Sequence, residues 1–178
     1  RALYETGWDI DIRAHHRRGG AIFGLCGGYQ MLGRRVEDPS GIEGPAGAID
    51  GLGMLDAVTI LTSDKALVEV KARALHHDVS GYEMHVGVTD GADTARPFLT
   101  ISNRLDGAVS ADGRVTGCYV HGLFAADGFR HAFLSSLRAR AESGVAYELG
   151  VEQALDELAV HLERHGDLDR MLEIAGAK

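Results

Sequence analysis

The sequence predicts an α/β fold, an open and mostly parallel sheet with an antiparallel excursion in the middle of the chain. Three observations support this prediction. A short apolar run at residues 21–25 leads directly into a glycine-rich turn, as at the end of a buried parallel strand. Apolar and polar residues then alternate along segments between residues 56 and 89, which indicates strands. Helical periodicity marks both ends of the chain, and 178 residues suffice for one domain, residues 1–178.

The apolar run and the turn after it are the most informative stretch. Residues 1–18 are expected to hold the tail of one element and a helix that ends at Gly19-Gly20. Beyond the strand, Gly24-x-Cys26-x-Gly28 has the spacing of a nucleophile elbow with Cys in place of Ser. Such a turn strains the backbone of the nucleophile and faces the thiol toward the positive end of a helix, which favours the thiolate. The alternative is a buried structural Cys in a glycine-rich turn between strand and helix.

The middle of the chain is expected to contain a loop and then strands. Residues 34–53 are rich in Gly, Pro and Asp, which predicts a long loop beside the site. Segments 56–61, 67–73 and 81–89 have the two-residue period of strands. Asp112-Gly113 is a strong hairpin signal, and the second strand of that hairpin delivers His121.

The C-terminal third is expected to be helical. Asp127 can cap a helix whose apolar residues fall on one side. Apolar residues repeat with helical period along residues 151–162, and Asp167 can cap a last short helix. No internal repeat or low-complexity tract interrupts this pattern.

Composition argues against several kinds of partner and location. A net charge of −8 without a basic run argues against nucleic acid or an anionic membrane surface as a partner. Two cysteines do not suggest a disulfide framework, and Cys118, in the middle of an apolar strand, is interpreted as an inert core thiol. A reactive thiol needs a reducing compartment, and no signal peptide or membrane-length apolar run is present, so a cytoplasmic location is expected. The chain begins with Arg, so we expect it to be a piece of a longer protein.

The stretch Gly24-Leu-Cys-Gly-Gly-Tyr-Gln-Met-Leu-Gly33, followed by Asp38-Pro39 and Gly41-Ile-Glu-Gly44, resembles the glutamine amidotransferase domains of the cobyric acid synthase family. The resemblance covers nearly the whole chain and continues in order through Gly51-Leu-Gly-Met-Leu55, Gly81-Tyr-Glu-Met-His-Val-Gly87 and Gly117-Cys-Tyr-Val-His-Gly-Leu-Phe124. It implies a class I glutamine amidotransferase fold, with a flavodoxin-like sheet and helices on both faces. It also implies that the N-terminal part of this domain, with one oxyanion loop, is missing here, so that residues 1–178 alone would be inactive.

The resemblance assigns the two catalytic roles. Cys26 corresponds to the nucleophile that attacks the side-chain amide of glutamine, and His121 corresponds to the base. From the residues alone, His121 is equally well a histidine that caps a strand end. Many amidotransferases carry a Glu two residues after this His, where it orients the imidazole. Here that position is Leu123, so the orienting group stays open.

Five further residues are expected near the glutamine. The N–H of Gly27 is a natural oxyanion donor, and Gln30, one helical turn on, is placed to touch the thioester or the glutamine carbonyl. Glu43 is a candidate for the substrate ammonium, although a loop carboxylate is more often simply solvated. Glu83 and His85 belong to the family motif and are expected to support the pocket wall. Their spacing also suits a metal, but no third ligand follows, so no metal site is predicted.

The implied function is that of a glutaminase that passes ammonia to a synthetase domain upstream in the same chain. By resemblance, that domain uses ATP and Mg to amidate carboxylates of adenosylcobyrinic acid a,c-diamide, a corrinoid bound elsewhere. No cofactor is expected in residues 1–178, which contain no P-loop motif. One alternative is a related amidotransferase with another acceptor, as in cobyrinate a,c-diamide synthesis or muropeptide amidation. The other is a non-catalytic module that binds glutamine or a regulatory partner, against which the presence of both Cys26 and His121 argues.

Overall fold

The computed structural model describes residues 2–138, 144 and 146–176, with residues 64–66 described by their backbone alone. The chain divides into two compact units, residues 1–140 and 141–178. The helices of the first unit, including two 3-10 turns (η), are α1 (Ala2–Thr6), α2 (Trp8–Arg17), α3 (Gly27–Leu32), η1 (Ala92–Ala95), η2 (Leu123–Ala125) and α4 (Asp127–Leu137). Its strands are β1 (Ile22–Leu25), β2 (Arg35–Asp38), β3 (Gly47–Asp50), β4 (Val58–Ala74), β5 (His77–Asp90), β6 (Leu99–Ile101), β7 (Arg104–Asp106), β8 (Ala108–Val109), β9 (Val115–Cys118) and β10 (Val120–His121).

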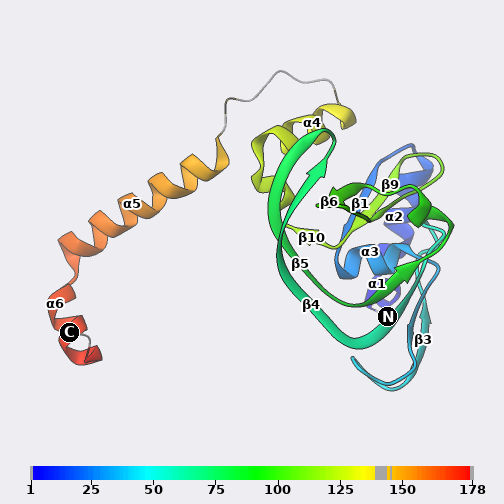
Figure 1. Cartoon of the computed structure of the whole chain (residues 1–178), viewed down its shortest axis with the longest axis horizontal. Coiled ribbons are helices and arrows are strands. Elements are labelled where there is room, and N and C mark those ends of the chain that lie inside the picture. Colours follow the sequence, from blue (N-terminus) through cyan, green and yellow to red (C-terminus); the bar gives the residue numbers. More distant parts are fainter. Residues whose placement is uncertain (1, 139–143, 145, 177–178) are drawn as a thin grey trace. The chain divides into compact units, whose positions relative to one another are not determined.

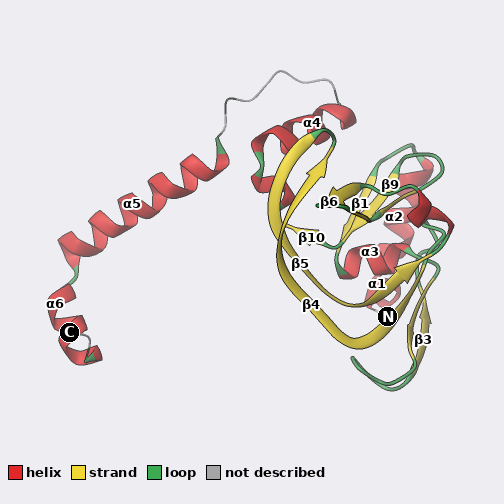
Figure 2. Cartoon of the chain, viewed as in Figure 1, coloured by secondary structure: helices red, strands yellow, loops and turns green. Residues whose placement is uncertain are grey.

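The strands form two mixed sheets, which confirms the predicted α/β class (Figure 2). The smaller sheet has the order β1-β9-β8, in which β1 and β9 are parallel. In the larger sheet the order is β10-β5-β4-β2-β3, with β6 beside β4 and β7 beside β6. Its β2–β4 pair is parallel, whereas the β4–β5 pair of the predicted excursion and the other described pairs of this sheet are antiparallel, so the sheet is less parallel than predicted. The chain passes from one sheet to the other at Tyr119, between β9 and β10.

The β4–β5 hairpin is the largest feature of the larger sheet. The two strands expected at residues 56–61 and 67–73 are one continuous strand, β4. Figure 1 shows this hairpin as a long curved ribbon that runs from α4 to the β2–β3 hairpin. The register shifts between Ile60 and Lys65, and Gly87 lies opposite the shift with φ +96°. A Cβ on Gly87 would lie 2.5 Å from the carbonyl oxygen of Ile60, so only glycine fits this bulge.

The prediction of a long loop at residues 34–53 is wrong, because the segment forms the antiparallel hairpin of β2 and β3. The carboxylate of Asp38 accepts the backbone N–H groups of Ile42 at 2.7 Å and Glu43 at 2.9 Å. These bonds lower the pKa of Asp38 and hold the chain in a turn. The Gly and Pro residues therefore mark the connection between two short strands, and the segment as a whole is not a loop.

The prediction that Asp127 caps α4 is also wrong. The helix begins at Asp127, and Ala126 is its N-cap. The carboxylate of Asp127 pairs instead with Arg130, one turn along the helix. The apolar side predicted for this helix is correct: Phe129 is fully buried, and Phe133 packs against the same core.

Two apolar clusters form the interior of the first unit. One joins β4, β5, β6, β9, β10 and α4 around Phe129, Val120 and Cys118, and the other joins α3, β8 and β9 around Leu55 and Val115. Cys118 has no exposed surface, and burial raises the pKa of its thiol to about 12. The thiolate is the reactive form of cysteine, so a thiol with a raised pKa is unreactive. Cys118 is therefore an inert core residue, as its place in an apolar strand predicts.

The second unit contains α5 (Tyr147–His165) and α6 (Leu168–Ala175). Asp167 caps α6 as predicted, since its carboxylate accepts the N–H of Arg170 at 3.0 Å. In the part of the chain that the structure describes, no helix has the length and apolar character needed to cross a membrane.

Candidate active site

Cys26 lies in a strained turn between β1 and α3. Its backbone has φ 52° and ψ −119°, a combination that residues with a Cβ rarely adopt. The turn depends on Gly24, because a Cβ there would lie 2.5 Å from Leu32 Cδ1 and 2.8 Å from the carbonyl oxygen of Gly28. This geometry is that of a nucleophile elbow and confirms the elbow predicted from the glycine spacing.

The strand partner β9 fixes the position of this turn. Leu25 is in register with Cys118, and the N–H of Cys26 donates to the carbonyl oxygen of Cys118 at 3.0 Å. Gly27 is the first residue of α3, where a backbone N–H has no acceptor within the helix. No atom lies within 4 Å of a Cβ built on Gly27 or Gly28, so the space in front of the turn is open.

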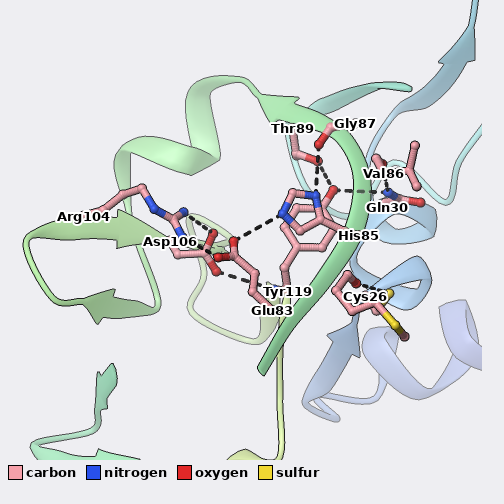
Figure 3. A network of polar contacts seen from close by, with 11 residues as sticks. Cys26, Gln30, Glu83, His85, Val86, Gly87, Thr89, Arg104, Asp106 and Tyr119 are labelled. Atoms are coloured by element: carbon pink, nitrogen blue, oxygen red, sulfur yellow. Dashed lines mark hydrogen bonds and ion pairs between the residues drawn. The ribbon is translucent and has the colours of Figure 1, made fainter. Parts of the chain in front are cut away.

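The thiol itself is directed at β5. Its Sγ donates to the carbonyl oxygen of Met84 at 3.1 Å, and the side chain is partly buried (Figure 3). Among the described residues, no hydrogen bond joins Cys26 to His121. Cys26 therefore rests against the main chain of β5 in the free protein.

A cavity of about 240 Å³ opens beside the thiol. It brings together five of the seven residues that the sequence predicts for the site, namely Cys26, Gly27, Gln30, Glu43 and His85. Leu61, Met84 and Val86 complete the lining. Glu43, which is exposed, reaches the cavity from the turn that Asp38 holds. Its place is therefore set by local hydrogen bonds that involve no other part of the site.

Gln30 has a fixed orientation. Its Nε2 donates to the carbonyl oxygen of Val86 at 3.1 Å and to the hydroxyl of Tyr119 at 3.3 Å (Figure 3). A carbonyl can only accept, so the nitrogen of the amide must face Val86, and both of its N–H groups are used. The side-chain oxygen of Gln30 has no partner within the described residues, which leaves an acceptor for a ligand in the cavity.

Glu83 and His85 share one face of β5, as predicted, and contact each other. His85 Nε2 lies 3.2 Å from Glu83 Oε1, and its Nδ1 lies 3.0 Å from the carbonyl oxygen of Gly87. The ring of His85 stacks on that of Tyr119, with 3.9 Å between centroids. These contacts fix His85 as part of the cavity wall (Figure 3).

Two charged residues on β7, which were not predicted from the sequence, complete this network. Arg104 donates to Glu83 Oε2 at 2.7 Å and to Asp106 at 3.3 Å. Burial and the nearby charge of Glu83 raise the pKa of Asp106. The backbone N–H of Tyr119, which donates to Asp106, and the positive charge of Arg104 lower it, but by less. Arg104 and Asp106 are two residues apart on a strand and therefore lie on the same face. This spacing of two charged residues is the signal in the sequence that could have identified them.

His121 reaches β5 separately from the cavity. In the β10–β5 ladder His121 is opposite Tyr82, and Val120 is opposite Glu83. Successive residues of a strand point to opposite faces, so Glu83 lies on the other face of the sheet from His121. Cys26 meets β5 at Met84, two residues from Tyr82, which is roughly 7 Å along a strand. The two predicted catalytic side chains thus contact β5 at positions that are two residues apart.

The ring of His121 has an unused nitrogen. Its Nε2 is buried and has no hydrogen-bond partner among the residues described. Leu123, two residues on, is 1% exposed and belongs to the apolar core. No carboxylate at that position can therefore orient the imidazole.

Within the described residues, no group of three or more His, Cys, Asp or Glu side chains is placed so that it could hold a metal ion. Glu83 and His85 are occupied by Arg104, Gly87 and each other instead.

Comparison with known proteins finds a matching family model and similar sequences. Residues 1–129 match the model of the CobB/CobQ-like glutamine amidotransferase domain. A cobyric acid synthase of Rhodobacter capsulatus is 58% identical over 177 residues, which cover 97% of this chain and 36% of that protein. The cobyric acid synthases of Cereibacter sphaeroides and Methylobacterium nodulans are 56% and 57% identical, over 97% and 98% of this chain and 36% of each relative. The chain thus spans about a third of the length of these relatives.

Proposed function

Because the chain belongs to the family of CobB/CobQ-like glutamine amidotransferase domains, we propose that it hydrolyses glutamine through a thioester on Cys26. The strained elbow is the observation that carries this proposal. Backbone strain of this kind persists only where the surrounding structure holds it, and it concentrates at functional sites. A structural cysteine in a turn needs neither the strain nor an adjoining cavity with polar walls.

In the proposed reaction the thiol leaves the carbonyl of Met84 and gives its proton to the free nitrogen of His121. The sulfur then attacks the side-chain amide carbon of glutamine, and a carbon–sulfur bond forms. The N–H of Gly27 donates to the oxyanion, and His121 returns the proton to the leaving nitrogen as the carbon–nitrogen bond breaks. Ammonia departs, and water hydrolyses the thioester to glutamate and free thiol.

The remaining cavity residues are proposed to bind the glutamine. With both N–H groups engaged, Gln30 offers only its oxygen, which suits the amide nitrogen of the substrate better than its carbonyl. Glu43 can accept from the α-ammonium group, and its exposure fits a role at the mouth of the cavity. Glu83 and His85 support the wall that β5 forms.

For the whole protein we propose the reaction that the relatives' name describes, cobyric acid synthesis, with glutamine as the nitrogen donor. The relatives are about three times as long as this chain, which is room for an ATP- and Mg-dependent synthetase domain in the same polypeptide. The acceptor carboxylates of adenosylcobyrinic acid a,c-diamide would bind there. The reactive thiol favours the cytoplasm as the compartment. A related acceptor, cobyrinate or a muropeptide, is the second candidate, since residues 1–178 do not contact the acceptor in this scheme.

Cys26→Ser in the intact gene product tests the proposal. The variant should lose glutamine-dependent amidation and keep the reaction driven by added ammonia, because Cys26 serves only to release ammonia. Cys118→Ser is the matched control and should keep both activities, because that thiol is buried and does not line the cavity. A folded Cys26→Ser enzyme that loses both reactions would contradict the proposed division of labour.

A further inference from the structure

Within the described residues, His121 has no acidic partner of the kind that orients a catalytic histidine in a triad. Leu123 occupies the position two residues on, and Glu83, the nearest carboxylate along β5, lies on the other face of the sheet. Glu83 is also engaged by Arg104 at 2.7 Å and by His85 at 3.2 Å. Another group must therefore fix the plane of the imidazole.

The ring of Tyr82 meets that requirement. The rings of Tyr82 and His121 are stacked with 4.8 Å between centroids and 2° between planes. The pair is directly opposed in the β5–β10 ladder, where cross-strand side chains on one face lie closest. A flat stack restrains the tilt of the imidazole and leaves the ring nitrogens, at its edge, free to exchange protons.

The residue before Tyr82 makes this stack possible. A Cβ on Gly81 would lie 1.9 Å from the carbonyl oxygen of His121, so the close approach of β10 to β5 requires glycine. Gly81 thus brings the two strands to the separation at which the rings touch. Within the described residues, the hydroxyl of Tyr82 has no hydrogen-bond partner, which indicates that the ring, and not the hydroxyl, is the useful part of this side chain.

We propose that Tyr82 is a positioning residue that holds His121 by ring stacking, in place of the carboxylate of a triad. The inference rests on the proposed function, because it assigns a partner to the proposed base. The aromatic face also stabilises the imidazolium that forms when His121 takes the thiol proton. Tyr82 acts through His121 and makes no contact with the glutamine.

The test compares Tyr82→Leu with Tyr82→Phe in the intact gene product. Aromatic pairing of this size predicts a kcat for glutamate release roughly 2-fold to 12-fold lower in Tyr82→Leu, with an unchanged KM. Tyr82→Phe should restore the wild-type kcat, because it keeps the ring. Val88→Ala, at another exposed position of β5, is the control and should match the wild type.

A wild-type kcat in Tyr82→Leu, a loss confined to KM, or a Phe variant as slow as the Leu variant would overturn the inference. If Tyr82→Leu fails to fold, Tyr82→Trp replaces it: stacking predicts near-normal kcat for Trp and Phe, and a slow Phe variant again overturns the inference. Failure of the proposed function would look different, because the wild-type protein itself would then release no glutamate.

Discussion

Gln30 provides a quantitative test of how the elbow helix is joined to β5. Its side-chain nitrogen is the donor to both the Val86 carbonyl and the Tyr119 hydroxyl. Gln30→Leu keeps a side chain of similar size but removes both bonds, which are part-buried. Each bond contributes about 0.5–1.5 kcal/mol, so opening of β5 in this region should become about 1–3 kcal/mol easier.

Hydrogen exchange of β5 amides in the intact gene product measures this change. Because about 1.4 kcal/mol corresponds to a factor of ten, exchange in peptides that cover residues 84–88 should be roughly 5-fold to 150-fold faster in Gln30→Leu. Met31→Leu is the control: Met31 is exposed on the same helix and should leave the exchange unchanged. Wild-type protection in Gln30→Leu would refute the bridge between α3 and β5.

Three further predictions follow from the site and its surroundings. His121→Asn should slow thioester formation by about 100-fold to 10,000-fold and Glu83→Gln by far less, and equal losses in rapid-mixing kinetics would place Glu83 in the catalytic set. Iodoacetamide at about pH 8 should leave Cys118 unmodified in the native protein, because burial raises its pKa to about 12; mass spectrometry that finds it labelled would contradict this. Ser110 and Arg114 lower the pKa of Asp112, so Asp112→Asn should lose the same stability at every pH above the ordinary 3.8, and the loss should shrink as the pH falls below 3.8 toward the lowered pKa. Melting curves across pH check that window, and a difference that grows in acid would reverse the sign of the argument.

Features set by neighbouring residues could be predicted from the sequence. The elbow at Cys26 follows from glycines two residues to either side, and the cap at Asp167 follows from a carboxylate before an apolar repeat. The Asp112-Gly113 turn joins β8 and β9 as predicted, but β9 ends at Cys118 and His121 lies on β10 of the other sheet. In each case, side chains within a few residues determine the backbone conformation.

Features that depend on distant strands could not be predicted in this way. Alternation along β5 suggests an apolar face to be buried, yet Tyr82 is 41% exposed and Glu83 is 7% exposed. The polar face is inside because Arg104, on β7, pairs with Glu83 there. The stack of Tyr82 on His121 depends likewise on the register of β10 against β5.

The proposed function requires that Cys26 form a covalent bond with the side-chain amide carbon of glutamine. A diazo-ketone analogue of glutamine traps such a nucleophile, and peptide mass spectrometry of the intact gene product locates the adduct. We predict one adduct per chain on the peptide that contains Cys26, prevented by excess glutamine and absent in Cys26→Ser. An unmodified Cys26 in protein that hydrolyses glutamine, or an adduct on another residue, would contradict the assignment of the nucleophile.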